Sequence, residues 1–235
     1  MTKRFRSSGV YVLSLALAVF VPAIGLVAAE DTVPPGKLAV LDLDAAKTTI
    51  TYSLDGWPHH TQGTFKLKHG VIEIDPSTQR MTGTITVDAT SGDSGHSIRD
   101  DEMKSSVLEV DRFPEISFAP SQVLEHGDPK KPFPVTVVGL MSLHGTQHAL
   151  TIDATVEREE NNVTIHCNFA VPFVEWGLRD PSILMFKVSK QVLVDVTANA
   201  RLSWIASTAA TSTTTPGAAR PMATRESASL DSKVQ

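Results

Sequence analysis

The chain has 235 residues, a formal net charge of −5 and a single cysteine, Cys167. One cysteine cannot form an internal disulfide, and we expect Cys167 to behave as a small buried apolar residue. A net negative charge makes nucleic acid and anionic membrane surfaces poor partners.

The N-terminal residues have the layout of a secretory signal peptide. Three basic residues within the first six precede an apolar stretch, residues 10–27, and then the small pair Ala28-Ala29. A transmembrane anchor is the alternative, but it needs about twenty apolar residues, and Pro22 and Gly25 interrupt this stretch. We therefore expect residues 1–29 to be removed, the protein to be periplasmic or secreted, and the mature chain not to insert stably into a membrane.

Cleavage after Ala29 makes the mature chain more acidic. The segment contains three of the 21 basic residues and no acidic one, so 18 basic residues face 26 acidic ones and the net charge becomes −8. The C-terminal segment, residues 205–235, consists mainly of Ser, Thr, Ala and Pro, a composition typical of disorder. One folded domain is predicted between them, over residues 37–204.

Within this domain, apolar and polar residues alternate with a period of two. This pattern is typical of strands with one face inside and one in water. The alternating runs cover residues 50–54, 65–74, 81–87, 116–118, 135–143, 150–156, 163–171 and 192–196. We predict an all-β domain of at least eight strands.

One helix interrupts the strands, over residues 99–109, where Met103, Val107 and Leu108 recur at helical spacing. Turn residues such as Asp75-Pro76 separate neighbouring strands, which favours a meander of antiparallel strands. We predict a closed eight-stranded barrel, because closure removes exposed strand edges. A two-sheet sandwich would show the same alternation.

Residues 87–120, VDATSGDSGHSIRDDEMKSSVLEVDRFPEISFAP, contain a series of distinctive motifs. A strand is followed by the Ser91-Gly92 turn, by Arg99-Asp100 at a helix start, and by Phe113-Pro114 before another strand. This order resembles the YceI-like, polyisoprenoid-binding family. Residues 137–152 and 173–196 are also similar to that family, so the resemblance covers residues 38–202.

The resemblance implies a lipocalin-like, eight-stranded antiparallel barrel with a helix near one end and a long apolar pore for an isoprenoid chain. One feature departs from the family pattern. Many members have a histidine and a leucine soon after Arg-Asp, whereas this chain has Asp101, Glu102 and Met103. The extra carboxylates would repel a pyrophosphate head group, so we expect a quinone or another neutral-headed lipid.

Arg99 and Asp100 each have two interpretations. Asp100 is expected to interact with free amide groups and the dipole at the helix start. Arg99 either pairs locally with Asp101 or Glu102, or lies at the pore mouth and contacts the polar head of a ligand.

The large apolar residues provide the other candidate ligand contacts. Trp57 and Trp176 lie in predicted loops, where they either plug the barrel ends or line an entrance. Inward-facing strand residues would either fill a solid core or coat a pore, because both arrangements need the same alternation. The candidate ligand-binding residues are Tyr52, Trp57, Phe65, Ile85, Arg99, Met103, Phe118, Met141, Phe169, Trp176 and Phe186.

Catalytic and metal-binding patterns are weak. His144 and His148 flank a predicted hairpin turn, where they need not converge, and no third ligand has suitable spacing. We therefore predict no metal site, no cofactor other than a bound isoprenoid or quinone lipid, and no enzymatic activity. The alternatives are a structural or stress-protection protein with a filled barrel, and a hydrolase-like enzyme using His96, Arg99 and Asp100. The oligomeric state is not predicted.

The first testable prediction concerns export. Protein secreted or exported by its host should begin at Glu30, because signal peptidase cleaves after small residues such as Ala28-Ala29. N-terminal sequencing and intact mass measure the start directly. A species that retains Met1 and fractionates with membranes would contradict the prediction.

Overall fold

The computed structural model describes residues 36–57, 60–125, 131–182 and 187–207. The predicted signal peptide, the segment 208–235 and Phe186 lie outside these residues. None of the described helices is long and apolar enough to cross a membrane.

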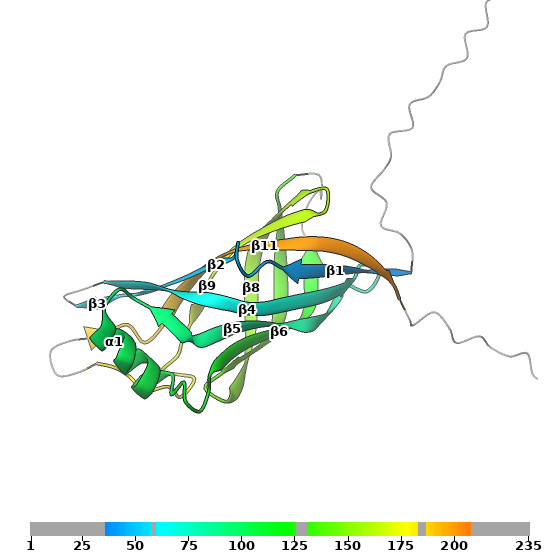
Figure 1. Cartoon of the computed structure of the whole chain (residues 1–235). Coiled ribbons are helices and arrows are strands. Elements are labelled where there is room, and N and C mark those ends of the chain that lie inside the picture. The colour runs from blue at the N-terminus through cyan, green and yellow to red at the C-terminus, as the bar shows by residue number, and fades with distance from the viewer. Residues whose placement is uncertain (1–35, 58–59, 126–130, 183–186, 208–235) are drawn as a thin grey trace, which may run out of the picture. The chain divides into compact units, whose positions relative to one another are not determined.

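The described residues form a closed antiparallel β-barrel with a short helix at one end (Figure 1). The strands are β1 (Lys37–Leu43), β2 (Thr49–Leu54), β3 (Gly56–Trp57), β4 (Thr61–Asp75), β5 (Arg80–Asp93), β6 (Glu115–Glu125), β7 (Phe133–Leu143), β8 (Thr146–Glu159), β9 (Asn162–Val171), β10 (Lys187–Val188) and β11 (Val192–Ala206). The short strands β3 and β10 pair only with each other.

Strand β11 closes the barrel. It pairs with β9 on one side and with both β1 and β2 on the other, and β1 and β2 each also pair with β4. The strands β1 and β2 therefore form one interrupted strand, and the barrel has eight strand positions. This confirms the predicted eight-stranded antiparallel barrel, although β1 was absent from the predicted strands.

The interruption between β1 and β2 is a hydrogen-bonded bulge. Leu43 pairs with Ala200 and Thr49 with Thr197, so residues 44–48 oppose only two residues of β11. Within this bulge, the side chain of Asn199 donates to the Lys47 carbonyl at 2.8 Å. The extra residues therefore bend the strand without leaving the bulge unpaired.

A second irregularity lies in β4. The register with β5 shifts between Leu67 and His69, and the inward-facing residues change from Phe65 and Leu67 to Gly70 and Ile72. The bulge keeps apolar residues facing inward on both sides of it, because one extra residue reverses the faces of a strand.

The helix begins earlier than the sequence predicted. Helix α1 spans Ser97–Glu102 and continues into a π-helical segment, η1, at Met103–Val107. The expected range of 99–109 was therefore shifted by two residues at both ends. Together α1 and η1 lie at the end of the barrel opposite the start of β1 (Figure 1).

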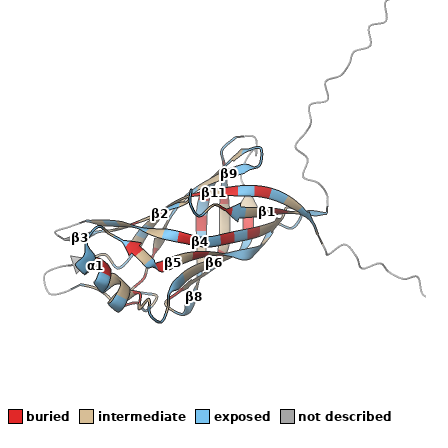
Figure 2. Ribbon diagram, in the orientation of Figure 1, coloured by how far each residue is buried: buried red, intermediate tan, exposed pale blue. Residues whose placement is uncertain are grey.

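Buried and exposed residues alternate along the strands, as Figure 2 shows. At the end of the barrel away from α1, the interior is filled by apolar side chains of two packed clusters. One cluster includes Leu202 with Val163, and the other includes Phe133 with Val123. This end of the barrel is a solid core.

Glycine at position 63 makes room for an aromatic ring on the neighbouring strand. Gly63 pairs with Tyr52, and a Cβ atom at position 63 would lie 2.6 Å from the Tyr52 ring and 2.4 Å from the Asp93 carbonyl oxygen. Real Cβ atoms do not approach other atoms so closely, so a larger residue must displace the ring or the strand.

We therefore predict that Gly63→Ala destabilises the domain. The expected loss is about 1–3 kcal/mol, from overpacking against the Tyr52 ring and backbone. Urea denaturation measures this loss, with Thr64→Ala as the control, because Thr64 is exposed on the same strand. Equal stability of Gly63→Ala and the control would contradict the close packing.

Candidate functional site

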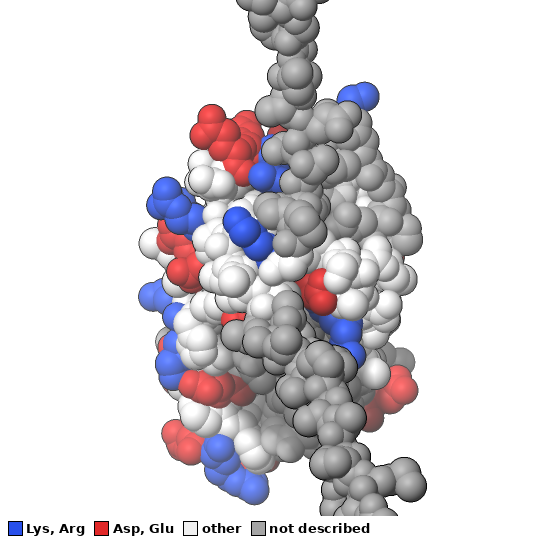
Figure 3. Space-filling view, turned by 90° about the vertical axis from the view of Figure 1, so that its right-hand side faces the viewer, with Lys and Arg blue, Asp and Glu red and all other residues white. Residues whose placement is uncertain are grey.

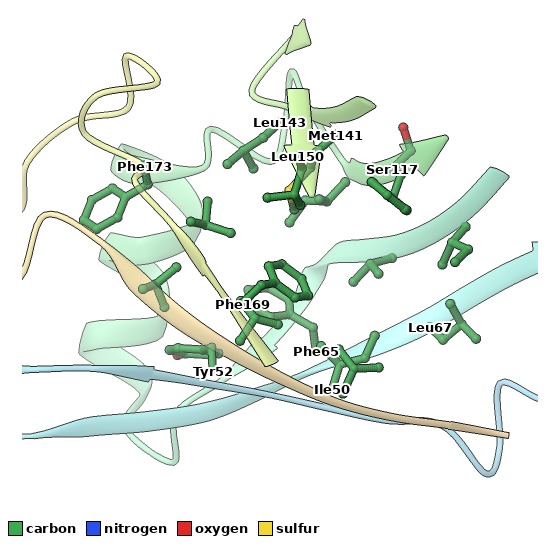
Figure 4. Close-up of a pocket in the computed structure, with 18 of the residues that line it drawn as sticks. Ile50, Tyr52, Phe65, Leu67, Ser117, Met141, Leu143, Leu150, Phe169 and Phe173 are labelled. Atoms are coloured by element: carbon green, nitrogen blue, oxygen red, sulfur yellow. The ribbon is translucent and has the colours of Figure 1, made fainter. Parts of the chain in front are cut away.

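The half of the barrel nearer α1 is hollow. It contains a cavity of about 950 Å³, at the upper end of the range for small-molecule sites. Its lining is apolar over most of its surface (Figure 4). All eight strand positions contribute side chains to it. The barrel is therefore filled at one end and hollow at the other, which contradicts the alternative of a barrel filled along its whole length.

Most of the candidate residues line this cavity. The inward-facing strand residues among them are Tyr52, Phe65, Ile85, Phe118, Met141 and Phe169. Arg99 of α1 and Met103 of η1 line it from the helical end. Figure 4 shows Tyr52, Phe65 and Phe169 gathered on one side of the space.

The remaining candidates do not belong to the described lining. Trp176 stacks on His148, with ring centroids 4.2 Å apart and planes within 1°. It is partly buried and packs against the apolar cluster of Leu108 and Phe173, so Trp176 lies behind residues that line the cavity. The side chain of Trp57 and all of Phe186 lie outside the described residues.

Two glycines make room for aromatic rings in the cavity wall. A Cβ atom at Gly139 would lie 2.7 Å from Phe118, and one at Gly92 would lie 2.7 Å from Phe65. The Phe65 ring in turn lies 5.3 Å from the ring of Tyr52. The absence of a side chain on the glycines therefore creates the positions that these rings occupy.

The exposed end of the cavity is marked by Ile98, which lines the cavity and is 85% exposed. The charged groups of the described lining gather near this mouth, whereas Thr48 and Ser117 add hydroxyls elsewhere. His96, Arg99, Glu102 and Thr61 line it there, whereas the described lining beyond it is almost entirely apolar. The cavity therefore has a polar mouth and an apolar interior.

Arg99 is positioned by neutral hydrogen-bond acceptors. Its guanidinium donates to the Ser94 hydroxyl at 2.9 Å, to the Ser94 carbonyl at 3.1 Å and to the Thr61 hydroxyl at 3.3 Å. Glu102 instead forms an ion pair with Arg179 at 3.6 Å. The predicted local pairing of Arg99 with Asp101 or Glu102 is therefore wrong. The sequence did not indicate Thr61, which lies 38 residues away.

Asp100 fixes the loop before α1 and does not cap the helix. The residue at the N-cap position is His96, which makes no side-chain cap. The Asp100 carboxylate accepts hydrogen bonds from the Ser94 amide at 2.9 Å and the Ser94 hydroxyl at 2.5 Å. Burial alone would raise the pKa of Asp100, but these bonds and the charges of Lys104 and Arg99 lower it below its usual value.

The mouth also contains the phenol of Tyr52. Burial and the negative charge of Asp100 raise the pKa of Tyr52, and the positive charge of Arg99 partly opposes them. The phenol is therefore neutral at physiological pH and keeps its proton. A neutral hydroxyl of this kind donates to a carbonyl or ether oxygen.

Cys167 lines the cavity wall deeper in the barrel. Burial, aided by the negative charge of Asp195, raises the pKa of the Cys167 thiol to about 11. The thiol therefore stays protonated at neutral pH and is a poor nucleophile.

The histidines near the barrel end do not form a metal cluster. His144 lies 3.3 Å from Glu109 and against the Phe113 ring, whereas His148 lies against Trp176. No group of three or more potential ligands occurs among the residues that the structure describes.

Charged side chains are mixed on the face shown in Figure 3. Lys and Arg side chains alternate there with Asp and Glu, and none of the described residues visible on this face form a broad patch of one sign. This face therefore has no electrostatic footprint typical of nucleic-acid binding.

A β-barrel with a large apolar cavity and a polar mouth belongs to the class of barrels that enclose small apolar ligands. Residues 41–200 match the model of the YceI-like domain, and the chain belongs to this family. The resemblance found in the sequence is therefore confirmed. A comparison with curated protein sequences found no match.

Solved structures have the same fold. Burkholderia cenocepacia BcnA is 18% identical, with a TM-score of 0.56 over 67% of this chain and 99% of that one. A polyisoprenoid binding domain from Saccharophagus degradans, implicated in plant cell wall breakdown, is 13% identical, with a TM-score of 0.50 over 69% and 98% of the two chains. At these identities the likeness concerns the fold alone.

The role of Asp100 in fixing the loop can be tested by its pH dependence. A carboxylate with a lowered pKa contributes stability above its unfolded-state value, near 4, and this contribution disappears as the pH falls through the folded-state value. Asp100→Asn should cost about 1–3 kcal/mol at pH 7, because buried hydrogen-bonded groups lose their partners. The difference from wild type should shrink below about pH 4.

Urea denaturation between pH 7 and pH 3 measures this effect. Asp101→Asn is the matched control, because Asp101 is adjacent and exposed. A constant difference between Asp100→Asn and wild type across this pH range would contradict the assigned role.

Proposed function

We propose that this protein is an exported carrier that holds one neutral-headed lipid with an isoprenoid or similar chain, such as a quinone. The observation that carries the proposal is the apolar cavity of about 950 Å³ with charged side chains near one end. The family membership and the fold shared with a polyisoprenoid binding domain support it.

The distribution of polarity supports a tail-first orientation. A hydrocarbon chain gains free energy by leaving water for the apolar interior, whereas a polar head placed there would lose its hydrogen bonds to water. The head group therefore stays at the mouth, near Tyr52 and Arg99, and the chain extends toward the closed end.

The charges at the mouth favour a neutral head group. Arg99 is the only Lys or Arg side chain in the described lining, and its guanidinium already donates to Ser94 and Thr61. Glu102 adds a carboxylate to the same lining. A pyrophosphate needs several cationic or amide donors, so a quinone carbonyl beside the Tyr52 phenol is the better match.

Binding is favoured over catalysis by the state of the polar groups. Arg99 and Asp100 are both used to hold the loop around Ser94, and the Cys167 thiol is protonated at neutral pH. The hydrolase alternative needs His96, Arg99 and Asp100 to act together on a substrate, but two of these three already have structural partners.

Extraction of the protein purified from its native host provides the direct test. Organic extraction followed by mass spectrometry should recover a neutral lipid with a long apolar chain, in an amount approaching one molecule per protein. A clean extract, or one that contains only charged phospholipids, would contradict the proposal.

Phe118→Asp should abolish lipid retention while the barrel stays folded. Phe118 lines the cavity, and an unpaired charge in an apolar space costs several kcal/mol, which excludes the chain. Leu140→Asp is the matched control, because Leu140 is 44% exposed on the neighbouring strand β7. Circular dichroism measures folding and extraction measures lipid. A folded Phe118→Asp variant that retains lipid like the control would show that the chain does not contact this residue.

A further inference from the structure

The cavity ends partway along the barrel, and its end can be located from the last lining residue on each strand. On β8 the inward residues Leu150, Ile152 and Ala154 line the cavity, but the next inward residue, Val156, does not. On β11 the lining ends at Ala198, and Ala200 beyond it belongs to the packed core. On β8 and β11 the floor of the cavity therefore lies at Ala154 and Ala198, whereas on β1 the lining extends to Leu43 and Leu41, which pair with Ala200 and Leu202.

Two side chains join the cavity to both core clusters. Met81 and Ile165 line the cavity and also pack against the clusters that contain Leu202 and Phe133. On the neighbouring strands, Ile74 pairs with Met81, and Val156 pairs with Ile165. Neither Ile74 nor Val156 lines the cavity, so Met81 and Ile165 lie at the boundary between the cavity and both core clusters.

Met81 and Ala154 differ in how they limit the space. Methionine is unbranched and flexible, and it fills irregular gaps between packed groups. Ala154 is 8% exposed and packs in the cluster of Val135 and Phe133, but its short side chain leaves open the space above it. A longer residue at 154 would extend into the cavity, and a shorter residue at 81 would deepen it.

We propose that Met81 and Ala154 determine the maximum chain length of the bound lipid. This inference rests on the proposed function, because it needs a chain that enters tail-first. The terminal isoprene unit of a chain of optimal length contacts these two residues. A longer chain leaves its excess at the mouth in contact with water.

The test is a series of prenols of increasing length, from geraniol through farnesol and geranylgeraniol to solanesol. Their affinities are measured by displacement of an environment-sensitive naphthalene dye from delipidated protein. In the wild type, each added unit that enters the cavity should raise the affinity at least about tenfold, until the chain reaches the floor and the affinity levels off.

The two variants should move this limit in opposite directions. Ala154→Leu should make the affinity level off at least one isoprene unit earlier, with the affinity for geraniol unchanged within about twofold. Met81→Ala should allow the affinity to rise for at least one further unit. Ala149→Leu is the matched control, because Ala149 is exposed on the outer face of the same strand. The control should level off at the wild-type length.

The outcomes separate this inference from the proposed function. If the wild type binds no prenol of any length, the proposed function fails. If the wild type binds prenols but the folded variants level off at its length, only the assignment of the floor is wrong. Thermal melting by circular dichroism checks folding, and if Ala154→Leu does not fold, the shift expected for Met81→Ala decides the question.

Discussion

The structure depends on the pairing of β11 with strands from both ends of the sheet. β11 hydrogen-bonds to β9 along ten residue pairs and continues on its other side to β2 and then β1. This pairing converts an open meander into a barrel and removes both sheet edges. It also fixes which side chains face inward, because one row of residues on every strand then shares a single enclosed space.

Closure alone does not decide whether that space is filled, and the two halves of this barrel differ in their side chains. Near the closed end, Phe133, Leu202 and Trp204 contribute to packed clusters. Near α1, glycines such as Gly92 and Gly139 let the rings of Phe65 and Phe118 lie against the wall. The hollow half therefore depends on glycines that leave room for these rings beside its wall.

The barrel and its inward-facing rows could be predicted from the sequence, because alternation with a period of two depends only on local order. Phe118 and Phe169 were placed on the inner face for this reason, and both line the cavity. The same pattern describes a solid core and a pore, so alternation alone did not predict the cavity, and the expectation of a pore came from the family resemblance. The partners of Arg99 were missed because Thr61 and Ser94 become neighbours only through the closed fold and the conformation of one loop.

The separation of mouth and floor has a consequence for specificity. The charged and hydrogen-bonding groups Arg99, Glu102 and Tyr52 lie near one end of the cavity, whereas Met81 and Ala154 lie where the other end meets the core. A ligand held in the proposed orientation contacts the first group only with its head and the second only with the end of its chain. Because groups that share no contacts contribute nearly independently to binding free energy, head-group selection and chain-length selection can change separately in such a barrel. A single antiparallel fold can therefore accommodate different amphipathic lipids through substitutions at either end, without altering the strand pairing that closes it.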